Sequence, residues 1–145
     1  MTSALELAAL LIASAFTSAA FYINFAEHPA RMKLPTSAAL MQWKPAYKAG
    51  FVMQATLAML GGAAAIAVAV LDGDWVWAIG GVTLILNWPY TLLVMLPLNN
   101  KLMAIETERA GEDVRGMLAR WNRLHSGRTL LGALATLLMI FATRT

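Results

Sequence analysis

The chain contains no cysteine and only two histidines, so several kinds of chemistry are absent from the start. Without cysteine there is no disulfide bond, no thiolate metal ligand and no thiol nucleophile. Charge is also scarce, because 13% of the residues are charged against roughly 25% in ordinary soluble domains. Of the 145 residues, 59% are apolar. This composition predicts a single integral membrane domain over residues 1–145.

Charged residues are missing altogether from four long segments. Residues 7–26, 49–71, 75–100 and 129–143 hold none, over 20, 23, 26 and 15 residues respectively. A helix rises ~1.5 Å per residue and needs about 20 apolar residues to cross a hydrocarbon core of roughly 30 Å. Three segments reach that length, and the fourth does so if the arginines that precede it extend to the interface. The sequence therefore predicts four transmembrane helices.

The predicted fold is all-α, an up-and-down bundle of four transmembrane helices. We expect the spans at about 5–27, 46–71, 75–98 and 122–143. No basic residue precedes the first span, which argues against a cleaved signal peptide there.

Proline and glycine predict where these helices end or bend. The first helix should stop at His28-Pro29, because a residue before proline avoids the α region. The following segment, from Pro29 to Pro45, is then expected to be a partly re-entrant or interfacial loop. Pro89 and Pro97 should each kink or loosen the third helix, since neither can donate to the carbonyl four residues back. Asp72-Gly73-Asp74 is predicted to form a tight turn.

Basic residues lie almost entirely in two of the three predicted connections. Ten of the eleven are found there: Arg31, Lys33, Lys44, Lys48, Lys101, Arg109, Arg115, Arg120, Arg123 and Arg128. The positive-inside rule makes that side cytoplasmic and puts both termini on the non-cytoplasmic side. The third and fourth helices should extend into the cytoplasm. We expect a bacterial inner membrane and lipid contacts, and no nucleic acid partner, because the +3 net charge forms no solvated basic face.

Each predicted helix also carries polar residues at its cytoplasmic end. In chain order they are Asn24, Glu27 and His28; Tyr47 and Gln54; Asn87, Tyr90, Thr91, Asn99 and Asn100; and Trp121, His125 and Arg128. Polar groups at membrane depth raise the free energy unless they are paired or face a wet cavity. We therefore expect these side chains to converge into one pocket that opens to the cytoplasmic leaflet. The opposite half of the bundle would be a scaffold of Ala, Gly, Leu and Val.

Structural roles are the simpler interpretation for some of these residues. Asn87 could join two helices by a hydrogen bond, and Glu27 could form an ion pair with Arg128. Aromatic residues near the headgroups anchor helices, while lysine and arginine fix topology and contact anionic lipids. These roles would apply to Trp43, Tyr47, Trp88 and Trp121, and to Arg31, Lys33 and Lys44.

The two histidines permit three kinds of chemistry. With Glu27, His28 and His125 would match the 2-His-1-carboxylate set that binds iron in oxygen chemistry. The two histidines alone could ligate copper or the iron of a b-type haem. Without a metal, either histidine could remove a phenolic proton while Arg128 and asparagines hold the oxyanion. The spacing does not choose among these, since no HExxH or other regular metal-ligand pattern is present.

Three motifs taken together resemble a known family. They are Asn24-Phe25-x-x-His28-Pro29; Asn87-Trp88-x-Tyr90-Thr91 followed by Pro97-x-Asn99-Asn100-x-Leu102; and Trp121-x-x-x-His125-x-x-Arg128. In this order they are similar to the anthrone-oxygenase-like family of small four-helix membrane proteins, and the resemblance covers nearly the whole chain. It implies oxidation of a tricyclic phenolic anthrone by O2, in which a methylene becomes a carbonyl and an anthraquinone is formed.

The resemblance also suggests roles for the polar residues. His125 would be a base or ligand, and His28 with Glu27 a second base or ligand pair. Asn87, Asn100 and Arg128 would position the substrate or hold its oxyanion. The remaining substrate-binding residues would be Asn24, Gln54, Tyr90, Asn99 and Trp121.

Two other functions compete with an oxygenase. One is a non-enzymatic membrane protein that binds a hydrophobic small molecule or a partner helix, and the other is a bis-histidine haem electron carrier. A transporter is disfavoured, because the non-cytoplasmic half shows no polar path. Four short helices enclose a small pocket, so a homo-oligomer is compatible with the sequence, although no residue indicates one.

Overall fold

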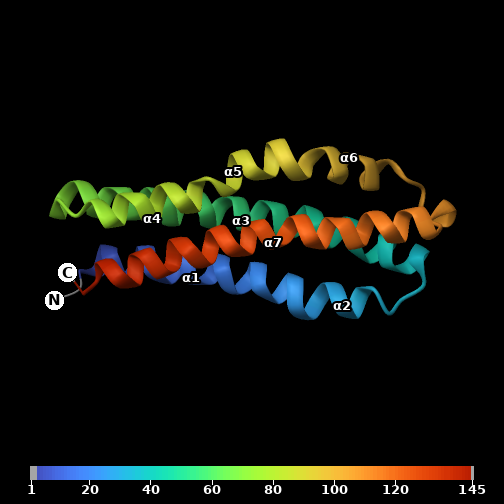
Figure 1. Ribbon diagram of the computed structural model, residues 1–145, viewed down its shortest axis with the longest axis horizontal. Helices are drawn as coiled ribbons and strands as arrows, with labels where there is room; N and C mark the ends of the chain where they lie inside the picture. The colour runs from blue at the N-terminus through green and yellow to red at the C-terminus, as the bar shows by residue number, and fades with distance from the viewer. Residues whose placement is uncertain (1–2, 145) are drawn as a thin grey trace.

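The structure, a computed structural model, describes residues 3–144 and consists of helices that lie side by side along one axis (Figure 1). Four helical stretches are long and apolar enough to cross a membrane: Ala4–Arg31, Thr36–Asp72, Trp75–Ala104 and Glu112–Ala142. No strand occurs within residues 3–144. The two ends of the chain lie at the same end of the bundle (Figure 1). The four-helix prediction is confirmed, while the side of the membrane that each end faces stays a prediction.

Two of the four stretches are not continuous α-helices. The first comprises α1 (Ala4–Tyr22), the π-helical turn η1 (Ile23–Glu27) and α2 (His28–Arg31). The third comprises α4 (Trp75–Ile85), α5 (Asn87–Tyr90), the π-helical turn η2 (Thr91–Met95) and α6 (Leu96–Ala104). The other two are single helices, α3 (Thr36–Asp72) and α7 (Glu112–Ala142), and the short 3-10 helix η3 (Thr107–Arg109) lies between α6 and α7. Single π turns inside α-helices are often found at functional sites.

The predicted boundaries around the first connection were wrong. The first stretch continues past His28-Pro29 to Arg31, because Pro29 stands in the first turn of α2, where a missing N–H is tolerated. Residues 32–35 alone connect α2 to α3. The expected re-entrant loop is therefore helical, with Pro45 inside α3. Both helices are consequently longer at this end than the sequence indicated.

The third stretch departs from α geometry where its prolines predicted. It is interrupted at Leu86, three residues before Pro89, and the π turn η2 ends just before Leu96-Pro97. A proline removes one backbone hydrogen bond and clashes with the carbonyl four residues back, which widens or bends the turn before it. The ribbon bends at α5 (Figure 1).

The tight turn between α3 and α4 is also confirmed. Gly73 adopts φ 74°, a left-handed conformation that favours glycine, and ends α3. The Asp74 side chain accepts a hydrogen bond of 2.9 Å from the Val76 N–H and caps α4. This turn makes α3 and α4 an antiparallel pair.

Glycines let α3 and α4 approach at backbone distance. A Cβ added to Gly81 would lie 2.7 Å from the Gly62 carbonyl oxygen and 3.1 Å from the Ala65 Cβ. A Cβ added to Gly62 would lie 2.8 Å from the Gly81 carbonyl oxygen. Small residues at such positions allow van der Waals contact between membrane helices, where no hydrophobic effect draws them together.

Two apolar clusters fill the bundle, with a polar layer between them. The cluster nearer the termini includes Ala13, Phe16, Ala58, Ala65, Trp77, Leu84, Ala135 and Met139. The cluster nearer the loops includes Leu40, Trp43, Met95, Leu102, Leu118 and Trp121. Along each stretch, buried polar residues such as Asn24, Gln54, Asn87 and His125 fall beside or between the two. The polar layer thus lies inside the bundle, because the helices extend beyond it toward the loops.

We predict that Gly81→Ala lowers stability by about 1–3 kcal/mol, because the new methyl group meets a backbone carbonyl that cannot rotate away. Unfolding by SDS titration from a mild detergent measures this, with helicity followed by circular dichroism. Gly116→Ala in α7 is the matched control, since nothing lies within 4 Å of its added Cβ. Equal stability of the two variants would contradict the close-contact interpretation.

Candidate functional site

Asn24, in the π turn η1, joins the first helix to α7. Its amide nitrogen donates to the Asn122 carbonyl oxygen at 3.0 Å and to the Asn122 Oδ1 at 2.8 Å, with Ser126 Oγ at 3.2 Å. Its Oδ1 accepts from Thr129 Oγ1 at 2.5 Å and lies 3.0 Å from His125 Nδ1. Asn24 is buried, so this network satisfies its amide within the protein.

These contacts fix the tautomer of His125. A backbone carbonyl can only accept, so the Asn24 atom that faces the Asn122 carbonyl is the NH2 group. The other amide atom, facing His125, must then be the oxygen, which also only accepts. His125 Nδ1 therefore carries the hydrogen, and in the neutral ring Nε2 carries the lone pair. The Asn24 side chain thus prepares Nε2 to accept a proton.

The His125 ring packs in an aromatic group together with Trp121. The two ring centroids are 4.9 Å apart, and Trp121 Nε1–H donates to Asn99 Oδ1 at 2.8 Å. Trp43 meets Trp121 edge to face at 5.8 Å and stacks on Tyr47 at 4.9 Å. The prediction that Trp43 and Trp121 are headgroup anchors was wrong, since both are buried.

The second histidine, His28, also lies near Trp121. Its ring centroid is 6.1 Å from that of Trp121, and its buried Nδ1 has no hydrogen-bond partner within residues 3–144. The rings of both histidines thus lie near the Trp121 ring.

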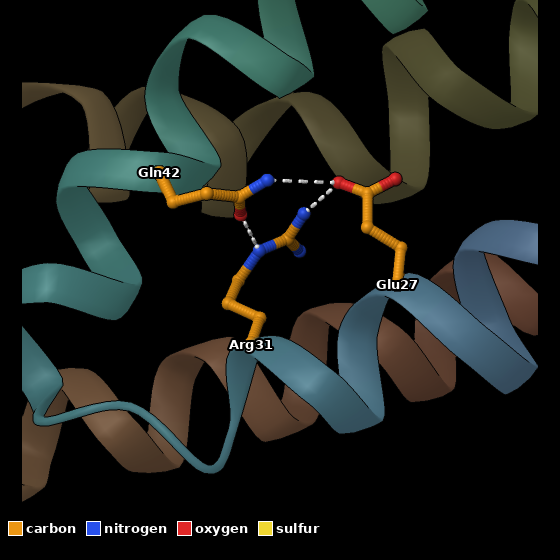
Figure 2. A network of polar contacts seen from close by, with 3 residues as sticks. All are labelled: Glu27, Arg31 and Gln42. Carbon is orange, nitrogen blue, oxygen red and sulfur yellow. Dashed lines mark hydrogen bonds and ion pairs between the residues drawn. The ribbon is translucent and has the colours of Figure 1, made fainter.

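Arg31 is a site residue that the sequence analysis assigned to lipid. It donates to Glu27 Oε1 through Nη2 and to Gln42 Oε1 through Nε, and Gln42 Nε2 donates to Glu27 at 3.3 Å (Figure 2). Its guanidinium lies 5.9 Å from the Trp121 ring centroid, and the residue is 4% exposed. Glu27 and Arg31 stand four residues apart on one helical stretch, so their side chains form an ion pair. Glu27 and Arg128 form no ion pair among the described residues. The predicted Glu27–Arg128 pair was therefore wrong.

Arg128 is buried without a carboxylate partner among the described residues. Its Cζ lies 5.6 Å from the Phe16 ring centroid, a cation–π contact, and its Nε makes no hydrogen bond there. Tyr47 and Tyr90 are the phenols near enough to interact electrostatically with the guanidinium. Its charge is buried, and a buried cation without a counter-ion is costly.

Tyr90 is held against α7 because Gly127 has no side chain. The Tyr90 hydroxyl donates to the Leu124 carbonyl oxygen at 2.7 Å, and a Cβ on Gly127 would lie 2.3 Å from the Tyr90 oxygen. This contact fixes one of the two phenols beside Arg128.

A narrow cavity, here called the His125 cavity, connects most of these groups. Its lining residues are Ile23, Glu27, Arg31, Trp43, Ala46, Tyr47, Gly50, Phe51, Gln54, Trp121, His125 and Arg128. About 20 Å³ is available to the centres of water-sized molecules, and roughly 10–15 Å³ of such space holds one water. Phe51 and Arg128 also line a second hollow, with Ala55, Ala58, Asn87, Trp88, Thr91 and Leu92.

The asparagines of the third helix differ in position. Asn87 is buried and donates to the Leu84 carbonyl oxygen of its own helix at 3.1 Å, so the interpretation as a helix-to-helix bridge was wrong. Asn99 is buried beside Trp121. Asn100 is exposed, so the structure does not place it with the predicted substrate positioners.

Sequence reasoning missed Arg31, Trp43, Gly50, Phe51 and Thr129 as site residues. Arg31 had a usable signal, the four-residue spacing from Glu27. Thr129 stands four residues after His125 and directly after Arg128, the last residue of the motif already recognised. Gly50 and Phe51 carried no signal, because both fit an ordinary membrane helix.

The described side chains do not fit a three-ligand metal site. Among residues 3–144, no three His, Cys, Asp or Glu side chains lie close enough to share a metal ion. Glu27 bonds to Arg31 instead, and His28 is absent from the lining of the cavity that His125 lines. The 2-His-1-carboxylate set is thus not assembled, and the two rings do not face one common space.

We predict that Asn24→Ala destabilises the protein by about 1–3 kcal/mol. The substitution leaves the Thr129 hydroxyl and the His125 Nδ1–H buried without their hydrogen-bond acceptor. SDS titration measures the loss. Thr136→Val is the control, since it removes one interhelical hydrogen bond to Thr17, of 2.9 Å, in the other half of the bundle. A smaller loss for Asn24→Ala than for the control would contradict a central role for Asn24.

Comparison with known families gives one match. The model of the family described as Anthrone oxygenase matches residues 43–138, which is 96 of 145 residues and runs from α3 into α7. The match includes Gln54, Asn87, His125 and Arg128 but begins after Asn24 and His28. No curated protein and no solved structure matches the chain. Since the family match spans well over half of the sequence, the chain belongs to the anthrone oxygenase family.

Proposed function

We propose that this protein is a membrane oxygenase that uses O2 to oxidise a planar phenolic substrate of the anthrone type in the His125 cavity. Family membership supports the reaction class. The observation that carries the proposal is the Asn24–His125 hydrogen bond, which leaves Nε2 free to act as a base on a residue that lines the cavity. A base held in one tautomer by a buried amide is the arrangement that general base catalysis requires.

The proposed reaction begins with proton removal. His125 Nε2 takes a proton from the substrate, whose aromatic rings spread the remaining negative charge, and the Arg128 guanidinium stabilises that anion. The anion reduces O2 and forms a carbon–oxygen bond at the former methylene carbon. The second C–H bond and the O–O bond then break, one oxygen stays as the new carbonyl, and the other leaves as water. One O2 is consumed for each carbonyl formed.

The His125 cavity is too narrow for a tricyclic ligand in this conformation. Its wall combines the first stretch (Ile23, Glu27 and Arg31) with α3 (Ala46 and Gly50), and an added Cβ on Gly50 would meet nothing within 4 Å. We therefore propose that the substrate, which is apolar and membrane-soluble, arrives between these two helices. Separation of the helices at this seam would admit it.

His125→Gln should lower turnover of an anthrone by 10²- to 10⁴-fold, roughly the contribution of a general base. Purified protein in mild detergent, supplied with anthrone, is followed by oxygen uptake and by the absorbance of the anthraquinone. Thr136→Val serves as the control for loss of a polar side chain outside the cavity. Full activity of a folded His125→Gln protein would refute the base assignment. If the wild type shows no oxygen uptake, the binding-protein alternative replaces the oxygenase.

Gly50→Leu should raise the KM for the same substrate at least several-fold, because its side chain would occupy the open space beside the seam. Steady-state kinetics of oxygen uptake measure this. Gly116→Leu is the matched control, an exposed helical glycine with the same free space. Unchanged KM in Gly50→Leu would show that the substrate reaches His125 by another route.

A further inference from the structure

The His125 cavity has more hydrogen-bond donors than the protein uses. Four side chains that line it carry a buried N–H group with no partner among the described residues: Arg31 Nη1, Trp43 Nε1, Gln54 Nε2 and Arg128 Nε. The one acceptor oxygen of this kind on the same lining is Gln54 Oε1. Buried polar groups are normally paired, so a surplus of donors indicates a ligand that is rich in acceptors.

The same lining also carries surplus positive charge. Arg31 and Arg128 both line the cavity, while Glu27 is its single carboxylate and already accepts from Arg31. Arg128 has no carboxylate partner within residues 3–144, and Phe16 offers it an aromatic face instead. A buried cation without a counter-ion is unfavourable. Binding of an anion inside the cavity would therefore stabilise it.

Gln54 strengthens this conclusion independently. It is 1% exposed, lies on the apolar helix α3, and neither amide atom has a partner in the described structure. Leaving both ends of an amide buried and unpaired costs free energy in the folded protein. A leucine would fill the same volume without that cost, so the amide is consistent with a binding role.

We propose that the His125 cavity binds an aromatic carboxylate, a ligand whose anionic oxygens face Arg128, Arg31, Gln54 and Trp43. The inference rests on the proposed function only for the idea that this ligand is the substrate. It adds a prediction about ligand selectivity. A neutral aromatic molecule of the same shape would leave the N–H donors unpaired and the positive charge without a counter-ion. The two carboxylate oxygens offer about four acceptor sites to these N–H groups, and Nε2 of His125 remains available for a proton elsewhere on the ring system.

A matched pair of fluorescent probes tests this. 1-Hydroxy-2-naphthoate carries a carboxylate, and its methyl ester has nearly the same shape without the charge. Their Kd values are measured by fluorescence titration against the full-length protein in an uncharged detergent. We expect the acid to bind at least 10-fold more tightly than the ester. Arg128→Gln and Gln54→Leu should each remove most of that preference.

Arg123→Gln is the control, because Arg123 is an exposed arginine on the same helix, and it should retain the full preference. Size-exclusion profile and helicity establish that each variant is folded. As a second readout, Arg128→Gln without ligand should unfold at the same temperature as the wild type or higher, since the lost cation has no carboxylate partner there. Equal binding of acid and ester to the wild type, or an unchanged preference in Arg128→Gln, would overturn the proposal.

A lipid phosphate is the other source of an anionic oxygen. Titration in nanodiscs with and without phosphatidylglycerol distinguishes the two sources. If the acid binds alike in both, the cavity takes the aromatic anion. Displacement of the acid by phosphatidylglycerol that disappears in Arg128→Gln would assign the cavity to lipid and overturn the proposal. Because these are binding measurements, they succeed or fail separately from the oxygen-uptake assay.

Discussion

The need to satisfy one buried amide organises the site. Asn24 lies where the first helix meets α7, and its carboxamide is the point at which both helices exchange hydrogen bonds. In hydrocarbon no water can replace a lost partner, so each of these bonds restricts how the two helices rotate against one another. The orientation of the His125 ring follows from this restriction, and the aromatic packing around Trp121 follows from the orientation of His125. A single interaction therefore fixes both helix register and imidazole tautomer.

The remainder of the bundle supplies rigidity with little chemistry. Near the termini, alanine and glycine allow α3 and α4 to meet at backbone distance, and the core there contains few polar groups. Near the loops, cationic side chains join segments that are distant in sequence by hydrogen bonds to backbone carbonyls. Arg115 donates to the Met32 carbonyl oxygen at 2.8 Å, and Lys44 donates to that of Ile105 at 2.6 Å. The polar layer is thus held from both sides, and its side chains have few ways to relax away from the cavity.

The span count and the helix breaks were predictable because they depend on local rules. Charge-free length fixes the spans, and Pro89, Pro97 and Gly73 act on their own turns. The first connection was misjudged, since a proline in the first turn of a helix looks the same in sequence as one that ends a helix. The partners of Arg31 and Arg128 were equally hard to predict. A charged side chain is unusual at that depth, so both arginines stand out in the sequence. Whether each forms an ion pair, packs on an aromatic ring or binds a ligand depends on how helices distant in sequence pack together.

The π turn η1 accommodates one extra residue in the first helix without changing the direction in which the flanking residues face. A π turn contains one residue more than an α turn, and each residue turns an α-helix by about 100°. Loss of one residue within 23–27 would therefore leave a regular helix in which Phe16 still packs on Gly132 and the residues after the turn keep their direction, while the side chains inside the turn, Asn24 among them, would change position. Length variation at this one turn is thus a route by which relatives could keep the bundle and exchange the chemistry of its cavity.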